Sequence, residues 1–113
     1  MSSSIREKSR VLFDDAYGIG ANGHGQADFV REMTPDEYLN AVLPVMGRKD
    51  TSVQIQQAIE QGTPIASPVL HVQWDDDSQG WQVVKHDGRH RALAARNIDP
   101  DIKMPVRVFV END

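Results

Sequence analysis

The stretch from Pro68 to Arg96 constrains the fold more than any other part of the chain, because its hydrophobic period changes within a few residues. Apolar and polar residues first alternate, as they do in a half-buried strand, and after an acidic turn they alternate again. An Asp-Gly pair ends the second alternation, and an alanine-rich helical segment follows. The sequence therefore predicts a β-hairpin that leads through a glycine turn into a helix, with strands over Pro68–Trp74 and Trp81–Lys85, a turn over Asp75–Gly80 and a helix over Arg89–Arg96.

A capping box marks the start of an earlier helix. Thr34 and Glu37 have the spacing at which each side chain caps the other's backbone N–H, and Pro35 occupies the first helical position, where a missing N–H costs nothing. The apolar residues that follow are spaced for a helix, and Pro44 is predicted to stop it.

The remaining predicted elements complete the domain. A second helix begins at Thr51 with Gly62 as its C-terminal cap, Asn97 ends the third helix in a left-handed conformation, and Met104–Val110 is the last strand. The predicted order is helix, helix, strand, strand, helix, strand. For a chain of 113 residues, this order predicts one compact α+β domain with a small mixed sheet.

The N-terminal segment is polar and glycine-rich. We predict a flexible arm or flap over residues 1–33 and the folded domain over residues 34–113, because Gly18–Gly25 holds four of the eight glycines and is costly to order. Its Gly-x-Gly-x-x-Gly spacing matches a dinucleotide fingerprint but lacks the flanking strand and helix. A flap that brings His24 over a site is the alternative. The apolar run Val11–Phe13 is a candidate surface for a homodimer.

Composition excludes several function classes. The chain has 12 Lys and Arg against 17 Asp and Glu, a formal charge of −5, which argues against binding along a nucleic acid by charge but allows a local basic patch. It contains no cysteine, so disulfides, cysteine-ligated zinc and thiol catalysis are excluded. We find no long apolar run and no apolar signal segment, and expect a cytoplasmic protein that does not enter a membrane.

The charge reverses locally at the third predicted helix. Residues 85–96 carry four basic side chains and one acid, a local charge of +3. A helix N-terminus binds anions, and arginine there is unfavourable unless an anion is present. This pattern predicts a phosphate or carboxylate site formed by Asp87, Gly88, Arg89, His90 and Arg91. The alternative is a helix that Asp87 caps, with its arginines solvated.

The sequence signals for a metal site are weaker than those for an anion site. His86 and His90 are four residues apart, but Asp87 and Gly88 break the helix between them, and only Asp87 or His24 is available as a further ligand, so we predict no metal site. We interpret Asp75–Asp77 as a solvated turn rather than a site for a hard metal.

Four segments together resemble one superfamily. His86–Ala95 resembles the phosphate-binding motif of the ParB/sulfiredoxin superfamily, in which a strand ends in an Asp-Gly-x-His-Arg type of turn that opens a helix. Thr34–Leu39, Gln61–Leu70 and Met104–Val108 resemble its flanking segments, most closely those of short phage-encoded members.

The resemblance implies a fold that binds nucleotide phosphates, with Asp87 shaping the turn and with Gly88, Arg89, His90 and Arg91 contacting the phosphates. Members of the superfamily clamp DNA with CTP, reduce sulfinic cysteine with ATP, phosphorylate serine or act as nucleases. The absence of cysteine excludes the reductase, and no helix-turn-helix follows for DNA partitioning. An acid of the serine-kinase type has candidates by position only, namely Glu32, Asp36 and Glu37.

Two functions follow as hypotheses. The first is a phosphate-recognising domain for a nucleotide or a nucleic-acid end, with nucleotide and Mg²⁺ as candidate cofactors; in a hydrolase or nuclease version His90 is the general acid or base. The second is a small acidic phage-type protein in the bacterial host cytoplasm that inhibits a host defence or nucleic-acid enzyme by binding to it. The sequence does not decide whether the protein is an enzyme.

Overall fold

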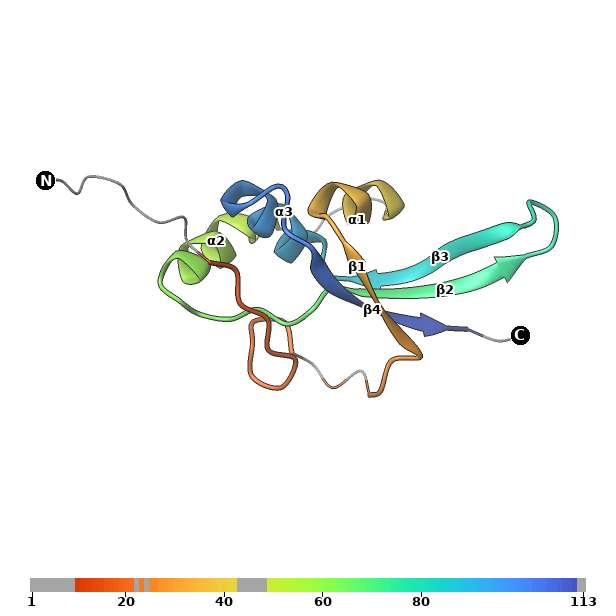
Figure 1. Ribbon diagram of the computed structural model, residues 1–113, viewed down its shortest axis with the longest axis horizontal. Helices are drawn as coiled ribbons and strands as arrows, with labels where there is room; N and C mark the ends of the chain where they lie inside the picture. The colour runs from red at the N-terminus through yellow and green to blue at the C-terminus, as the bar shows by residue number, and fades with distance from the viewer. Residues whose placement is uncertain (1–9, 22, 24, 43–48, 112–113) are drawn as a thin grey trace, which may run out of the picture.

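Three helices and a four-stranded mixed sheet make up the described part of the chain, as the computed structural model shows (Figure 1). The structure describes residues 10–21, 23, 25–42 and 49–111. The predicted α+β class is confirmed. In chain order the elements are β1 (Phe29–Met33), α1 (Pro35–Ala41), α2 (Ser52–Glu60), β2 (Val69–Asp75), β3 (Gly80–Asp87), α3 (Arg89–Ile98) and β4 (Met104–Val110).

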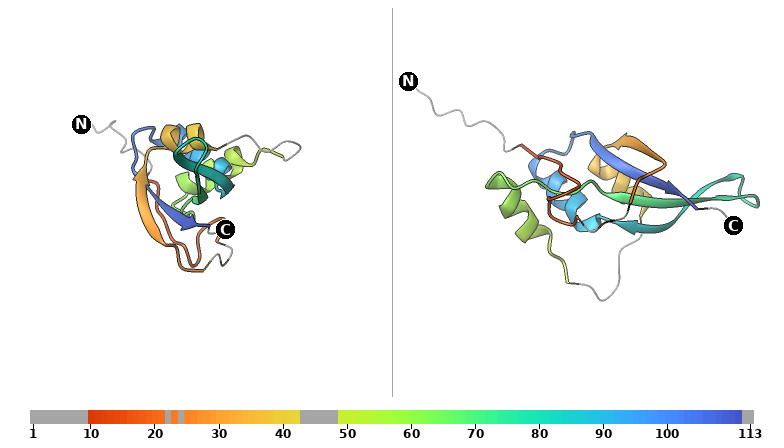
Figure 2. Two further views of the ribbon diagram at one scale, coloured as in Figure 1. Left: turned by 90° about the vertical axis from the view of Figure 1, so that its right-hand side faces the viewer. Right: turned by 90° about the horizontal axis from the view of Figure 1, so that it is seen from below.

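The sheet order is β1-β4-β2-β3, so the last strand along the chain lies between β1 and β2. β4 runs parallel to β2 and antiparallel to β1, and β3 is the antiparallel return of the predicted hairpin. The helices gather at one end of the sheet, and the β2–β3 hairpin projects from the other end (Figures 1 and 2). The register of the hairpin shifts between His71 and Val72, which makes Val84 of β3 an extra, bulged residue.

β1 was not predicted from the sequence. It lies N-terminal to the boundary that we predicted at Thr34, and its pairing with β4 places Phe29–Met33 in the sheet. Four of its five residues are exposed, and its apolar residues do not alternate with polar ones, so β1 lacks the periodic signal of a strand. Its only strand partner among the described residues is distant in sequence.

The capping box of α1 is confirmed. The Glu37 backbone N–H donates to Thr34 Oγ1 at 3.2 Å, and the Thr34 backbone N–H donates to Glu37 Oε1 at 2.9 Å. The bond from the Thr34 backbone N–H, together with a smaller contribution from the Thr34 hydroxyl, lowers the pKa of the Glu37 carboxyl. The helix ends at Ala41, and the stop predicted at Pro44 lies outside the described residues.

The two other helix ends differ in how well they were predicted. Gly62 follows α2 with a φ of +88°, and its N–H donates to the Ile59 carbonyl, as expected of a glycine cap. The prediction that Asn97 ends α3 in a left-handed conformation is wrong. Asn97 is helical and its amide donates to Gln56 of α2, and the helix ends where Pro100 forces Asp99 into an extended conformation.

The core lies between the helices and one face of the sheet. Tyr38, Ile59, Met104 and Val106 are among its fully buried side chains. The part of α3 that packs into the core is made of alanines, which let the helix lie close to its neighbours: Ala92, Ala94 and Ala95.

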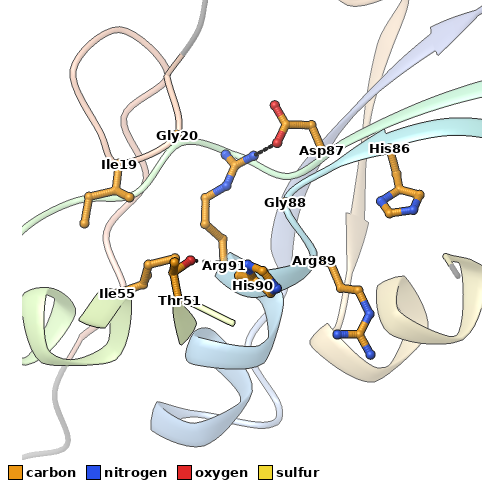
Figure 3. A pocket seen from close by; sticks show the side chains of 10 residues that line it. All are labelled: Ile19, Gly20, Thr51, Ile55, His86, Asp87, Gly88, Arg89, His90 and Arg91. Carbon is orange, nitrogen blue, oxygen red and sulfur yellow. Dashed lines mark hydrogen bonds and ion pairs between the residues drawn. The ribbon is translucent and has the colours of Figure 1, made fainter. Parts of the chain in front are cut away.

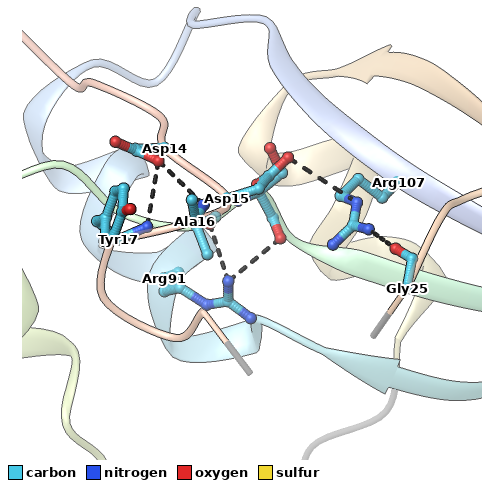
Figure 4. A network of polar contacts seen from close by, with 9 residues as sticks. Asp14, Asp15, Ala16, Tyr17, Gly25, Arg91 and Arg107 are labelled. Carbon is cyan, nitrogen blue, oxygen red and sulfur yellow. Dashed lines mark hydrogen bonds and ion pairs between the residues drawn. The ribbon is translucent and has the colours of Figure 1, made fainter. Parts of the chain in front are cut away.

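The segment before β1 packs along the loop that leads into β2. Val11 is buried, and Phe13 and Ile19 each form a β-bridge with Ile65. The Asp15 carboxylate accepts the Ser67 backbone N–H at 2.7 Å. Its Oδ2 lies 3.8 Å from Arg107 Nε of β4 (Figure 4). Val11 thus serves the chain's own core, and the flexible arm and the homodimer stay predictions. Among the described residues, no helix is long and apolar enough to cross a membrane.

Candidate functional site

A pocket of about 230 Å³ lies where β3 passes into α3 (Figure 3). All five residues of the predicted anion site line it, and they come together because they are consecutive in the chain. The other walls come from the segment before β1 and from α2 and its N-cap residue. The lining residues are Ile19, Gly20, Thr51, Ile55, His86, Asp87, Gly88, Arg89, His90 and Arg91.

Gly88 makes the turn that aims α3 at the pocket. Its φ is +131°, which favours glycine, and a Cβ there would stand 2.8 Å from Pro68 Cα. Gly88 is also the N-cap of α3, and no side chain caps this end. The alternative in which Asp87 caps the helix is wrong, because the carboxylate of Asp87 pairs with Arg91 and Gly88 is the N-cap residue.

The N-terminus of α3 has the electrostatics of an anion site. The backbone N–H groups of its first turn have no acceptor within the helix, and they carry the positive end of the helix dipole. No acidic side chain stands in the first turn, and Arg89 and His90 occupy it, both half-buried in the pocket wall. An anion in this pocket therefore meets both backbone donors and a guanidinium.

Arg91 has a different environment from Arg89. Only 4% of it is exposed, and its Nη1 donates to the carbonyls of Ala66 at 2.8 Å and Ser67 at 3.2 Å. Its Nη2 lies 3.1 Å from Asp87 Oδ1 (Figure 3). The guanidinium therefore ties the loop before β2 to the start of α3. A phosphate contact by Arg91 stays a prediction: its Nη1 serves the fold, whereas its buried Nη2 makes no hydrogen bond with the described residues.

Gly20 forms the wall opposite Arg91. Its φ is +89°, and a Cβ at this position would stand 2.7 Å from Arg91 Cζ. The glycine spacing that resembled a dinucleotide fingerprint thus includes a position where backbone must approach a side chain. The next element after it is β1 rather than the helix of that fingerprint. His24 lies outside the described residues.

His90 is held by α2. Its Nδ1 lies 3.2 Å from Thr51 Oγ1, so the threonine predicted to begin this helix contacts the site instead of capping the helix. Asp50 precedes it, and hydrogen bonds from Ser52 lower the pKa of the Asp50 carboxyl, with smaller contributions from His90 and Arg89. The Asp50 carboxylate therefore lies close enough to His90 and Arg89 to interact with their charges.

Tyr38 of α1 packs in the core beneath the pocket, next to the start of β2. Its hydroxyl donates to the Val69 carbonyl at 3.0 Å, and the side chain is fully buried in the core. Burial raises the pKa of Tyr38, and the nearby charge of Arg91 opposes this shift. Tyr38 is therefore neutral at ordinary pH, and its hydroxyl supports the start of β2 through the bond to Val69.

The other predicted candidates lie elsewhere. Glu37 serves the cap of α1, Asp36 pairs with Arg96 at 3.2 Å, and Glu32 sits on β1 opposite Pro105, so none of the three acids lines the pocket. Within the described ranges, no three His, Asp or Glu side chains converge as metal ligands.

Asp75 binds its own turn. Its carboxylate accepts from the hydroxyl of Ser78 at 2.9 Å and from the amide of Gln82 at 3.0 Å.

Comparisons with models of known protein families, with curated proteins and with solved structures find no match. Function is therefore inferred from the pocket alone.

Proposed function

We propose that the protein is a phosphate-recognising binding domain for a nucleotide or a phosphorylated nucleic-acid end. The observation that carries the proposal is the pocket at the uncapped N-terminus of α3, lined by Arg89 and His90. Free backbone donors and the positive end of a helix dipole are present there, and Arg89 borders the pocket; together they favour a doubly charged oxyanion. The proposed relation to the ParB/sulfiredoxin superfamily is consistent with this strand-glycine-helix junction.

The proposal assigns each wall a role. Phosphate oxygens accept from the first N–H groups of α3 and from Arg89, and Gly88 keeps the backbone free of a side chain where the phosphate approaches. Ile19 and Ile55 offer an apolar surface to the organic part of the ligand. Arg91 is a positioning residue in this scheme, because it fixes the turn through Asp87.

His90 is the candidate for chemistry. It lies beside the proposed phosphate position, and Thr51 orients its ring. In a hydrolase version of the site, His90 donates a proton to the leaving oxygen or accepts one from water. A His90→Gln variant that still binds the ligand but no longer releases phosphate or cleaves an oligonucleotide would assign this role; intact turnover in that variant would remove His90 from it.

Thermal shift and calorimetry test binding. The probes are inorganic phosphate, the common nucleotides with and without Mg²⁺, and one oligonucleotide with and without a 5′-phosphate. We expect Arg89→Ala to weaken binding of the best probe about tenfold or more, because a hydrogen bond between charged groups is lost.

Arg96→Ala is the matched control. Arg96 lies on the same helix, in its last turn, and pairs with Asp36 away from the pocket. The Arg96→Ala variant removes the same charge from the chain as Arg89→Ala does. Because Arg96 does not line the pocket, we expect the affinity for the probe to be unchanged. Equal losses in the two variants would indicate a general charge effect, and the lack of a response to every probe would refute the proposal.

A further inference from the structure

Two independent features of the pocket in Figure 3 point to an anion: the N-terminus of α3 and the buried guanidinium of Arg91. Arg91 is 4% exposed, and its buried Nη2 makes no hydrogen bond with the described residues. An ion pair with Asp87 at 3.1 Å balances its charge without satisfying its N–H groups. Because a buried donor without an acceptor is costly, an anion in the pocket finds a prepared partner beside the backbone N–H groups of α3.

The size of the pocket limits how much of a ligand it encloses. Its volume is about 230 Å³, below the roughly 300 Å³ at which pockets for complete small molecules begin. Ile19 and Ile55 contribute apolar surface to the same small volume. The pocket therefore has room for one phosphate group and the first carbon atoms attached to it, and the rest of a larger ligand stays outside.

The charge of the pocket also matches one phosphate group. Its lining holds the guanidinium groups of Arg89 and Arg91 and the carboxylate of Asp87, a net charge of +1 when the histidines are neutral. The helix N-terminus adds roughly half a positive charge, and a phosphomonoester carries about −1.5 to −2 at neutral pH. A second or third phosphoryl group adds negative charge that no lining cation is left to balance. Asp50, which adjoins the lining residue Thr51, repels that charge.

The carboxylates near the pocket are engaged by the chain itself. Nucleotide sites that use Mg²⁺ hold it with one or two carboxylates together with the phosphates of the ligand. Among the described residues that line the pocket, Asp87 is the only acid, and its carboxylate pairs with Arg91. The Asp50 carboxylate accepts the Ser52 backbone N–H at 2.8 Å. A metal ion would have to compete with a buried guanidinium or with the start of α2 for these oxygens.

We propose that the pocket takes a single terminal phosphate, carried by a small phosphomonoester such as a nucleoside monophosphate, and binds it without Mg²⁺. Arg91 Nη2 and the first N–H groups of α3 donate to the phosphate oxygens, and Ile19 and Ile55 contact the adjoining carbon atoms. An internal phosphodiester fits less well, because it carries less negative charge and needs room for a second carbon substituent. This inference rests on the proposed function, since it specifies the ligand of the same site.

Isothermal titration calorimetry of the full chain, in EDTA and in Mg²⁺, tests the number of phosphates and the need for a metal. The probes are ribose 5-phosphate, the monophosphates and triphosphates of adenosine and uridine, and the dinucleotides ApA and UpU, which have one internal phosphodiester and no terminal phosphate. We expect the monophosphates to bind in EDTA, with dissociation constants that Mg²⁺ changes by less than about twofold. The triphosphates and the dinucleotides should bind at least about tenfold more weakly in either buffer.

Two residues at the start of α2 provide matched variants. Thr51 lines the pocket and makes no side-chain cap, whereas Val53 is 61% exposed and does not line it. Thr51→Lys adds a cation at the pocket, so it should raise the affinity for the triphosphates about threefold or more relative to the monophosphates. Val53→Lys adds the same charge to the same helix turn and should leave this ratio unchanged, with circular dichroism confirming that both variants are folded.

The outcomes separate this inference from the proposed function. Triphosphates that bind as tightly as the monophosphates, in EDTA or only with Mg²⁺, would overturn the inference and leave the phosphate site in place. Dinucleotides that bind as tightly as the monophosphates would also overturn it. Equal ratios in Thr51→Lys and Val53→Lys would show that the added phosphates do not lie at the pocket. Binding of no probe in either buffer would refute the proposed function itself.

Discussion

Arg91 shows how one residue joins two regions of the chain that are distant in sequence. Its guanidinium holds the carbonyls of Ala66 and Ser67 and pairs with Asp87, and Gly20 packs against it. A buried arginine needs such partners, because an unpaired charge in the interior is costly. Sequence reasoning grouped Arg91 with residues that line the same pocket, but it could not distinguish the buried environment of Arg91 from the more open one of Arg89.

The contact between Gly20 and Arg91 can be measured against a control glycine. Gly20→Ala places a methyl group 2.7 Å from Arg91 Cζ, whereas Gly23→Ala meets nothing within 4 Å. Both positions have a positive φ, so both variants lose about 1 kcal/mol of stability from backbone strain. We expect Gly20→Ala to lose clearly more in urea unfolding, and to weaken binding of the best phosphate probe. Equal losses in the two variants would contradict the contact.

At the scale of elements, most of the confirmed predictions depend on local signals, although the local prediction that Asn97 ends α3 is wrong. The α1 capping box, the hairpin and the Gly88 turn depend on neighbouring residues, and the structure has all three. β1 and the outer wall of the pocket depend on distant contacts: Phe29–Met33 pairs with β4, and Ile19 reaches the site by packing along Ile65. Local periodicity holds no information on such pairings.

The capping box of α1 can be followed through the pKa of the Glu37 carboxyl, which changes when the box is broken. Hydrogen bonds with Thr34 hold the pKa of Glu37 below its ordinary value of 4.5. Because the folded pKa is lowered, the stability that this group contributes is present above the unfolded pKa and is lost as the pH falls through the folded pKa. We expect Thr34→Ala to cost about 1 kcal/mol at neutral pH.

NMR titration of the Glu37 side chain measures the same effect directly. In Thr34→Ala the pKa of Glu37 should rise part of the way toward its ordinary value, because alanine removes the hydroxyl but keeps the backbone N–H that lowers this pKa most, while the pKa of Asp50, which Ser52 lowers, should not change. An unchanged pKa of Glu37 in this variant would show that the Thr34 hydroxyl does not act on the Glu37 carboxylate in solution.

At the scale of the whole molecule, the N-terminal segment and the domain share hydrogen bonds. Ile65 is fully buried, its N–H donates to the Leu12 carbonyl at 2.8 Å, and its carbonyl accepts from Asp14 at 2.9 Å. Ala66 donates to the Ile19 carbonyl at 2.8 Å. The segment thus resembles an added strand that forms one side of the pocket, although its glycines predict an arm.

Deletion of residues 1–21 distinguishes these two descriptions. If the segment is part of the fold, its removal exposes Ile65 and Arg91, and we expect a lower midpoint of thermal unfolding and loss of phosphate binding. A shorter deletion of residues 1–9 is the control and should change neither. An unchanged midpoint after the longer deletion would support the flexible arm predicted from the sequence.

The position of β4 has a consequence for how the chain acquires its structure. β4 follows every other described element in sequence, yet it lies inside the sheet and supplies the pairing partner of β1 and one partner of β2. During synthesis, therefore, β1 is made well before its pairing partner, and only the hairpin and the helices can form by local contacts beforehand. The sheet cannot be completed without β4, and a chain that stops before Met104 exposes apolar strand edges to which other chains can add.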